Sequence, residues 1–323
     1  MTRYSQILGT GSYVPKRTLT NAELETMVDT TDAWILSRTG IASRQIVVDE
    51  NTSDLAYQAA EKAIADAGIE KSAIDLFIVA TVTPDMPFPG VSQLLQRRLG
   101  LNTITAFDLN AACSGFLYAL NVADKMIQSG AYRLALIVGA ETLTKITDYS
   151  DRNTCVLFGD AAGAMVIGPS DTPMIKDVVT YAKGDLEGHL TMDGYPLKQH
   201  FKTPDQDRPF LRMQGSEVFK FATTALPKTI RTLLKRNRLE LDDLALIVAH
   251  QANRRIIDKA ARTLDYPMEK MYLNIDRYGN TSAASVPLAI DEAIKEGALK
   301  KGDTFITVAF GAGLTWGGAL ITL

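Results

Sequence analysis

The sequence is poor in cysteine and histidine, and both shortages restrict what the protein can be. Cys113 and Cys155 are its two cysteines, so no disulfide framework is expected and a reducing cytoplasm is the predicted location. Histidines number three among 323 residues, at 189, 200 and 250. No charged segment followed by an apolar one opens the chain, so we expect no signal peptide.

The chain also lacks an excess of charge of either sign. Charged residues make up 22% of the sequence, and the formal net charge is −3. This balance argues against general nucleic-acid binding. One uncharged stretch, residues 304–323, is long enough to span a bilayer. Its apolar residues fall into two runs around a glycine-rich middle, so two buried strands are expected there and no membrane segment.

Apolar strands alternate with amphipathic helices along the whole chain, which is typical of an α/β protein. The strands are continuous apolar runs, so we expect them to be buried on both faces and largely parallel. Segment 183–214 has no such pattern, and we expect His189 and His200 in it to face solvent. Pro227 lies inside a long helical segment and either kinks it or begins a second helix. Strands are expected at 5–11, 74–81, 134–139, 164–167, 244–249, 305–309 and 318–322, and helices at 21–28 (with Asn21 as N-cap), 53–67, 92–99, 216–237, 253–264 and from about 283.

The two halves of the chain share a pattern. Residues 75–81 and 244–250 are apolar strands that each follow a helix and a short turn, and residues 163–167 resemble 318–322. A duplicated α/β unit explains both matches. We therefore expect two halves, residues 1–170 and 171–323.

Cys113 stands where an apolar strand ends in small residues and an apolar helix begins. A thiol at a helix start faces unpaired backbone N–H groups and the positive end of the helix dipole, which favour the thiolate. The small neighbours Ala112 and Ser114 leave room for a substrate carbonyl. The alternative is a buried structural cysteine, since free cysteines are often buried. The local sequence leaves both interpretations open.

Two further polar residues occupy comparable junctions. His250 follows the strand at 244–249, at the end where α/β sheets bind their ligands. Asn280 lies in a turn of small residues before the last long helix. Alone, His250 could hydrogen-bond a loop and Asn280 could serve as a turn residue. Together with Cys113 they form a Cys, His and Asn set at three strand-to-helix junctions.

These three motifs resemble those of the β-ketoacyl-acyl-carrier-protein synthase III family. The likeness covers Ala111–Phe116, His250–Asn253 and Tyr278–Ser285, and it extends over nearly the whole chain. The family initiates bacterial type II fatty-acid synthesis. The resemblance implies a thiolase-like fold of two βαβαβαββ halves in five layers (αβαβα), and a homodimer.

The resemblance also implies a mechanism. Cys113 would attack an acyl-CoA thioester, and the backbone N–H groups of Cys113 and Ala312 would hold the oxyanion. His250 and Asn280 would stabilise the enolate formed when malonyl-acyl carrier protein loses CO2. No cofactor or metal is implied. Where the family commonly has three glycines, this chain has Gly311-Ala312-Gly313, which retains the backbone donor.

Other positions match the family one by one. Trp34, Arg38 and Arg152 would bind the CoA adenine, and Asn253 the pantetheine; without the family, Trp34 and Arg38 would be a surface pair. The acyl pocket would be lined by Leu157, Phe158 and, from a dimer partner, Phe88. Cys155 lacks the glycine context of a thiolase acid/base cysteine, so we expect it in the core or a pocket wall. The acyl carrier protein would dock on Gln251, Ala252, Asn253, Arg254 and Arg255.

Carrier proteins are acidic, so docking requires a basic patch on this acidic chain. Arg254, Arg255 and Lys220 are expected to form it. Four more cations recur at helical spacing: Lys228, Arg231, Lys235 and Arg238. They either extend the basic patch or form a solvated helix face.

Three functions remain at this stage. The first is condensation of a short acyl-CoA, acetyl-CoA foremost, with malonyl-carrier. The second is a starter condensing enzyme of a secondary-metabolite pathway. The third, a non-catalytic carrier-binding module, would not need Cys113, His250 and Asn280 together.

Overall fold

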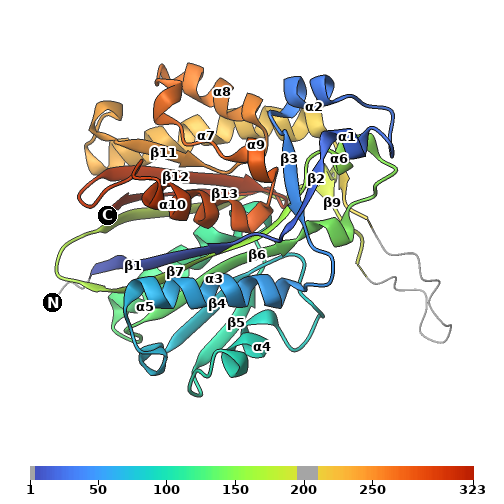
Figure 1. The fold of residues 1–323 in the computed structure, drawn as a ribbon. Coiled ribbons are helices and arrows are strands. Elements are labelled where there is room, and N and C mark those ends of the chain that lie inside the picture. The colour runs from blue at the N-terminus through green and yellow to red at the C-terminus, as the bar shows by residue number, and fades with distance from the viewer. Residues whose placement is uncertain (1–3, 195–209) are drawn as a thin grey trace.

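The computed structural model describes residues 4–194 and 210–323 (Figure 1). Two β-sheets lie between helices, giving the five layers of a thiolase-like α/β fold. Within the described residues, no helix is long and apolar enough to cross a membrane. His200 lies outside the described part of the chain.

The first sheet has the strand order β1-β7-β6-β4-β5. β4 pairs in parallel with β5 and β6, whereas β7 pairs antiparallel with β1 and β6. The strands span Tyr4–Tyr13 (β1), Leu76–Ala80 (β4), Thr105–Leu109 (β5), Ala135–Thr142 (β6) and Asp160–Ser170 (β7).

The second sheet repeats this arrangement with the order β11-β12-β13-β8. β11 and β12 are parallel, and the other two pairings are antiparallel. A single bridge from Ile247 to Met271 stands where β5 pairs in the first sheet. Both sheets are therefore mixed, and the expectation of largely parallel strands was wrong because each sheet ends in antiparallel neighbours. The strands span Ile175–Ala182 (β8), Leu246–Ala249 (β11), Thr304–Gly311 (β12) and Thr315–Thr322 (β13).

Two helices form the middle layer, and the others cover the outer faces. α5 and α10 contact strands of both sheets; α3 and α4 cover the first sheet, and α7 packs on the second beside α8 (Figure 1). The first sheet uses residues up to 170 and the second uses residues from 175, which supports the proposed division at 170/171. The helices span Thr52–Ala67 (α3), Val91–Arg98 (α4), Gly115–Ser129 (α5), Gly215–Asn237 (α7), Arg254–Leu264 (α8) and Ser285–Lys295 (α10).

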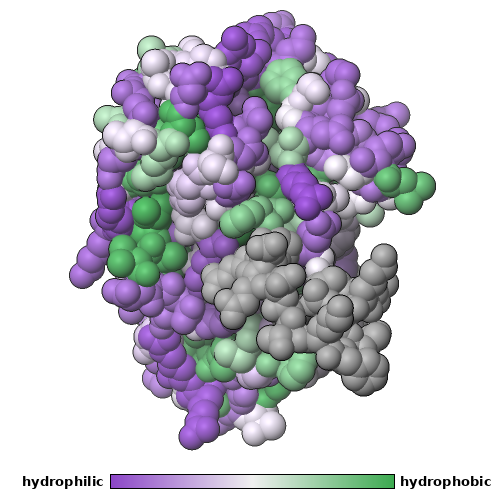
Figure 2. All heavy atoms as spheres, turned by 90° about the vertical axis from the view of Figure 1, so that its right-hand side faces the viewer, coloured by the Kyte–Doolittle hydropathy of each residue, from purple (hydrophilic) through white to green (hydrophobic). Residues whose placement is uncertain are grey.

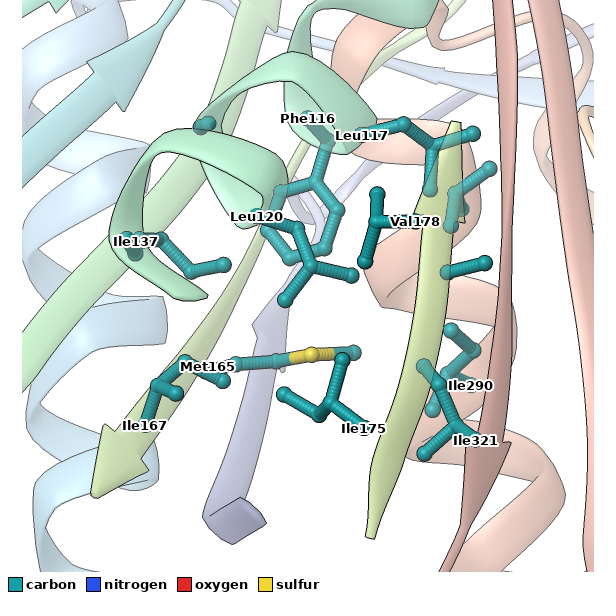
Figure 3. Close-up of a cluster of buried hydrophobic side chains, with 14 of the residues drawn as sticks. Phe116, Leu117, Leu120, Ile137, Met165, Ile167, Ile175, Val178, Ile290 and Ile321 are labelled. Carbon is teal, nitrogen blue, oxygen red and sulfur yellow. The ribbon is translucent and has the colours of Figure 1, made fainter. Parts of the chain in front are cut away.

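The main core lies between the two sheets, around the middle helices. Figure 3 shows Phe116, Leu117 and Leu120 of α5 directed toward Met165 and Val178, which come from the two sheets. The burial of apolar side chains in this way is the dominant favourable contribution to the free energy of folding. This packing holds the N-terminal ends of both helices in place, and those ends carry the functional turns described below.

Several small elements were not expected from the sequence. β2 and β3 form a two-stranded antiparallel sheet, and β9 pairs with β10 inside the stretch predicted to be irregular. Thr20, with Glu23, caps α1; Asn21 does not, because its side chain donates to Asp32 and to the Ile41 carbonyl. α7 continues through Pro227 as one helix. The remaining elements are Arg17–Thr20 (β2), Asn21–Leu24 (α1), Asp32–Thr39 (α2), Ser43–Ile46 (β3), Lys71–Ala73 (η1), Ala112–Ser114 (η2), Leu143–Ile146 (η3), Arg152–Cys155 (α6), Leu190–Thr191 (β9), Arg212–Met213 (β10), Leu241–Asp243 (η4), Met268–Lys270 (η5), Ile275–Tyr278 (α9) and Ser282–Ala284 (η6).

Candidate active site

Cys113 lies in the short helical turn η2, between strand β5 and helix α5. Ala112, just before it, has a left-handed backbone with φ 47°. The turn is fixed on both sides, because Ser114 donates to the Ala111 carbonyl through both its N–H and its hydroxyl, at 3.2 and 2.8 Å. The predicted strand-to-helix junction is thus present, and its sharp backbone sets the direction of the thiol.

The protonation state of Cys113 differs from the expected thiolate. Enclosure of the thiol raises its pKa to about 12; a hydrogen bond from Ser282 opposes the rise, and the Glu141 carboxyl adds to it. The cause is desolvation, which penalises the charged form more than the helix start favours it. At neutral pH the group is a thiol, so its proton has to leave as the sulfur attacks.

The glycine-rich loop after β12 lies against Cys113. A Cβ on Gly311 would be 2.6 Å from the Cys113 nitrogen, so only glycine permits this approach. The Thr315 hydroxyl donates to the carbonyls of Ala312 and Ala111 and contacts the Ser114 hydroxyl at 2.7 Å. These contacts fix the Ala312 backbone beside the start of η2.

His250 follows β11 and is almost completely buried, with 1% of its surface exposed. Its N–H donates to the Val308 carbonyl at 2.8 Å, and its ring meets the edge of Phe310 with centroids 5.3 Å apart. Neither ring nitrogen has a hydrogen-bond partner among the described residues. Burial lowers the pKa of His250 to about 3, so the imidazole is neutral and one of its nitrogens carries a donor proton.

Asn280 is held by the strand-like segment beside it. Its N–H donates to Leu157 O at 2.8 Å, and its carbonyl accepts from Gly159 N at 3.0 Å. Its side-chain Oδ1 accepts from Ser282 N at 2.9 Å. The oxygen of the amide is thereby engaged, which leaves the Nδ2 donor available to another group.

The structure brings the three motifs together. η2 contacts both the end of β12 and η6, the turn that follows Asn280. The His250 loop joins the same centre, because Gln251 N donates to Ser285 Oγ at the start of α10, at 2.8 Å. The turns that carry a thiol, a neutral imidazole and an amide donor thus lie together, and among the described residues the His250 ring nitrogens have no hydrogen-bond partner.

The residues expected around an acyl pocket fall into two groups. Leu157 and Phe158 are buried, and Cys155 packs with them in one cluster; burial raises its pKa to about 11. Cys155 is thus a core residue, as one of the two expectations had it. Phe88 instead is 85% exposed, and it cannot line the pocket of its own chain from that position.

The residues expected to bind CoA gather around α2. The Arg152 guanidinium stands 5.0 Å over the Trp34 ring, and Asn253 Nδ2 donates to the Arg38 carbonyl at 3.1 Å. Trp34 is half-buried, whereas the two arginines are exposed. Hydrophilic side chains dominate the upper part of the face in Figure 2, the height at which α2 lies in Figure 1.

Most of the segment expected to bind a carrier protein is accessible. Arg254 and Arg255 are exposed at the start of α8, and Ala252 is partly exposed beside them. The Arg255 guanidinium lies 5.6 Å from the Phe219 ring.

Gln251 is the exception in this segment, with only 1% of its surface exposed. Its amide donates to the carbonyls of Ala249 and Tyr272 and accepts from Asn274 N. It therefore supports the segment from inside, and the expectation that it faces a partner was wrong. The predicted stripe is exposed, with Lys228, Arg231 and Lys235 on α7 and Arg238 just after its end.

His189 does not face solvent freely, contrary to expectation. It is partly buried, and its Nδ1 lies 2.5 Å from Asp185 Oδ1. With Glu187 these residues bring three ligand-type atoms within 4.8 Å of one another, the group in the described chain that could hold a metal. The active-site residues do not belong to it.

Sequence reasoning missed two polar side chains behind Cys113. Glu141 is completely buried near the end of β6, and Ser282 joins it to the thiol. The signal for Glu141 was available: it is the single acid in the otherwise apolar run from 134 to 141.

Comparison with known proteins gives a consistent result. The family model for 3-oxoacyl-[acyl-carrier-protein] synthase III matches residues 107–184, and the model for its C-terminal part matches residues 234–323. A relative from Xanthomonas campestris pv. campestris, named beta-ketoacyl-[acyl-carrier-protein] synthase III, is 49% identical over 98% of both chains.

Solved structures agree over the whole length. The 3-oxoacyl-[acyl-carrier-protein] synthase III of Aquifex aeolicus is 43% identical with a TM-score of 0.92, covering 99% of this chain and 100% of its own. The priming beta-ketosynthase of the R1128 polyketide pathway is 39% identical with a TM-score of 0.94, covering 100% of this chain and 97% of its own.

Proposed function

This chain belongs to the 3-oxoacyl-[acyl-carrier-protein] synthase III family, and we propose that it joins a short acyl-CoA primer to malonyl-acyl carrier protein. It is a condensing acyltransferase, and it performs the initiating condensation of fatty-acid synthesis. We propose acetyl-CoA as the primer. The products are then 3-oxoacyl-acyl carrier protein, CoA and CO2.

In the first half-reaction, Cys113 attacks the thioester carbonyl and CoA leaves. A covalent acyl-Cys113 divides one difficult transfer into two easier ones. The backbone N–H groups of Cys113 and Ala312 are the proposed oxyanion donors. Support comes from the close approach of Gly311 to the Cys113 nitrogen, which puts the two backbones side by side.

In the second half-reaction, His250 and Asn280 hold the thioester oxygen of the malonyl group. As CO2 leaves, negative charge builds up on that oxygen, and preorganised donors in a buried site stabilise it strongly. The observation that carries the function is the pair of available donors: among the described residues both His250 ring nitrogens lack hydrogen-bond partners, and the Asn280 side-chain oxygen already accepts from Ser282 N, which leaves its Nδ2 to donate. Because His250 is neutral, its ring N–H can donate a hydrogen bond to the thioester oxygen without transferring the proton.

The CoA adenine would lie against Trp34 and Arg152, with Arg38 beside it and Asn253 on the pantetheine. The Arg152 guanidinium lies over the Trp34 ring. An aromatic face and a planar guanidinium suit a purine base. Because Arg38 and Arg152 are exposed, we propose that the nucleotide lies at the surface and that its thioester end points inward.

An acidic acyl carrier protein would dock on Arg254 and Arg255, with Ala252 and Asn253 between them and the site. Both arginines are exposed at the start of α8, directly after His250 and its loop. Complementary charge speeds such encounters. The exposed cations of α7 extend the basic surface on the neighbouring helix, which packs against α8.

We further propose a homodimer whose partner completes the acyl pocket. β5 is an edge strand of the first sheet, and the loop after β4 carries Phe88 outward. Met86 of the same loop is exposed as well, and exposed large apolar side chains that cluster in this way mark contact surfaces. In the dimer, Phe88 of one subunit would reach the pocket lined by Leu157 and Phe158 of the other.

We expect the reaction to need no cofactor and no metal, because Cys113, His250, Asn280 and backbone donors account for each step. A cytoplasmic location is proposed for a related reason. Both cysteines are free thiols in the structure, and a catalytic thiol has to stay reduced.

The decisive experiment follows labelled acetyl-CoA and malonyl-acyl carrier protein to labelled acetoacetyl-acyl carrier protein. Cys113→Ala should form no acyl-enzyme. Asn280→Ala should still form acyl-enzyme but should not condense it. If wild-type protein forms no product with any short acyl-CoA, the proposed function is wrong.

A second candidate has its own support. The R1128 priming ketosynthase is as similar in fold as the fatty-acid enzymes, so a starter enzyme of a polyketide pathway is the alternative. The two candidates differ in primer and carrier. Side-by-side rates with acetyl-CoA and longer acyl-CoA primers, each on the fatty-acid carrier and on a polyketide carrier, decide between them.

A further inference from the structure

Glu141 is a buried carboxyl that the reaction described above does not use. It stands near the C-terminal end of β6 and is completely buried. Its oxygens accept hydrogen bonds from the Val82 N–H and from the hydroxyls of Thr81 and Thr83, at 2.5 to 3.3 Å. None of these partners carries a positive charge.

A carboxylate buried without a cation is held less strongly in its charged form than one in water. Burial accordingly raises the pKa of Glu141 to about 7, although its hydrogen bonds from Thr83, Val82 and Ser282 oppose the rise. Glu141 can therefore gain or lose a proton near neutral pH, which an ordinary glutamate cannot.

Ser282 connects Glu141 to the nucleophile. Its hydroxyl donates to Glu141 Oε1 at 3.0 Å, and the turn η6, which begins at Ser282, contacts η2, which carries Cys113. Ser282 is close enough to the thiol to lower its pKa. The backbone of Ser282 is fixed as well, because its N–H donates to Asn280 Oδ1 and its φ is 48°. One hydroxyl held in this way can accept a proton on one side and donate one on the other.

We propose that Glu141 is a positioning residue that takes up the proton of Cys113 through Ser282 during acylation and returns it after condensation. The inference rests on the acyl-Cys113 chemistry proposed above. Glu141 does not touch the substrate; it acts through the Ser282 hydroxyl.

The proton balance closes over the cycle. During acylation the sulfur–acyl bond forms and the bond between the acyl carbon and CoA sulfur breaks. The Cys113 proton passes to Ser282 Oγ while the Ser282 proton passes to Glu141 Oε1, and the CoA thiolate takes a proton from solvent. In condensation the malonyl carboxylate leaves as CO2, and its electron pair forms the new carbon–carbon bond. Cys113 departs as a thiolate and recovers the stored proton.

His250 is the other candidate for this role, and the geometry disfavours it. The His250 ring nitrogens have no hydrogen-bond partner among the described residues, whereas Ser282 bonds Glu141 and begins the turn η6, which contacts η2. The groups facing Glu141 are hydroxyls and an N–H from the end of β4 and from η6, with Cys113 beyond Ser282. Cys113 is therefore the titratable group to which Glu141 is coupled.

The first test compares two reactions of the same thiol. Glu141→Gln keeps the shape but cannot take a proton, so acylation by acetyl-CoA should slow about 10²-fold. Alkylation of Cys113 by iodoacetamide at alkaline pH, where hydroxide takes the thiol proton, should not slow, because the variant removes a negative charge that raises the thiol pKa. Ser282→Ala should slow acylation similarly, and Glu141→Asp should restore part of the rate.

Asp160→Asn is the matched control. Asp160 is a buried carboxyl of the neighbouring strand β7, bonded to Thr144 and Val47 and unconnected to Cys113. Its variant should leave the ratio of the two rates unchanged. If Glu141→Gln acylates at the wild-type rate, or if both of its reactions fall together as in a damaged fold, the proposal is overturned.

The second test uses wild-type protein and so does not depend on a variant that folds. A pH-indicator dye in a stopped-flow experiment measures protons exchanged during the acylation burst. At about pH 7.5, above the pKa of Glu141 and below that of an ordinary thiol, storage on Glu141 predicts uptake of one proton per acyl-enzyme. Release of the Cys113 proton to solvent predicts none, and that result would overturn the proposal.

The proposed function can fail separately from this inference. If no acyl-CoA labels Cys113 in wild-type protein, the proposed acyl-transfer function is wrong, and the proposed role of Glu141 is wrong with it. If labelling occurs with no proton uptake, the function stands and only the role of Glu141 is wrong.

Discussion

Ala112 and Ser282 share an unusual left-handed backbone, with φ of 47° and 48°, at matching places in the two halves. Each lies two residues after an asparagine whose Oδ1 accepts its N–H, at 3.2 Å from Asn110 and 2.9 Å from Asn280. The same turn is thus used twice, once to present Cys113 and once to present Asn280. The site is therefore formed by two copies of one turn, one from each half of the duplicated chain.

The first prediction concerns the strain in this turn. A non-glycine residue in the left-handed region is less stable than glycine there, but glycine loses more entropy on folding. Ala112→Gly should therefore change the free energy of unfolding by less than about 1 kcal/mol, yet slow acyl-enzyme formation about tenfold because Cys113 is held less firmly. Urea unfolding and labelled acyl-enzyme formation measure the two effects.

Ala112→Val should instead destabilise the protein by about 2 kcal/mol, because a β-branched side chain is strained at this φ. Ala106→Val on the edge strand β5 is the control, since valine suits a strand. Equal losses in the two valine variants would show that the backbone of Ala112 is not the cause.

The second prediction concerns Gly311. A Cβ there would meet the Cys113 nitrogen at 2.6 Å, so Gly311→Ala has to push η2 and the end of β12 apart. If the two backbones form the oxyanion hole, acylation should fall 10²- to 10³-fold, roughly the effect of losing one such donor. Gly184→Ala is the control, because a Cβ at Gly184 meets nothing within 4 Å. Unchanged acylation in Gly311→Ala would exclude the Ala312 loop from the oxyanion hole.

The residues that sequence analysis placed correctly share a local signal. Cys113 and His250 each follow an apolar run, and parallel strands gather such ends at one edge of a sheet. The small sheet of β2 and β3 gave no such signal, because its four-residue strands are largely polar. Arg44 in that sheet is fully buried, which only its tertiary partners explain: it donates to the carbonyls of Leu19 and Val156.

The protonation states could not be predicted for the same reason. The start of a helix is visible in a sequence, and it suggested a thiolate at Cys113. The desolvation that outweighs it depends on how the folded chain encloses the thiol, which the local sequence does not show. Glu141 was visible as an acid in an apolar strand, but the hydroxyls that satisfy it come from other segments.

The third prediction concerns the nucleotide end of the primer. Trp34→Ala removes the aromatic face under Arg152, and base stacking of this kind contributes about 1–3 kcal/mol. The KM for acetyl-CoA should rise about tenfold or more with little change in kcat. The KM for acetyl-pantetheine, which has no adenine, should stay the same. Arg98→Ala, which removes a cation–π contact with Tyr57, is the control. A KM that rises for both primers would contradict an adenine site at Trp34.

The fourth prediction is a dependence of stability on pH. Folding raises the pKa of Glu141 from 4.5 to about 7, so the folded protein binds a proton in this window that the unfolded chain does not. The contribution of Glu141 to stability is complete below about pH 4.5 and is lost as the pH rises through about 7, by roughly 3 kcal/mol in all. Glu141→Gln lacks this loss. The stability of the variant relative to wild type should therefore increase between these two pH values.

Urea unfolding at a series of pH values measures this difference. Burial of neutral His250 makes stability fall as the pH drops below about 6.5, but it does so in both proteins and cancels in the comparison. Glu269→Gln, at an exposed site, should give a curve parallel to wild type. If Glu141→Gln is also parallel, the carboxyl is not protonated by folding and cannot store a proton near neutral pH. If the stability of Glu141→Gln relative to wild type rises with pH, the folded protein keeps Glu141 able to accept a proton near neutral pH.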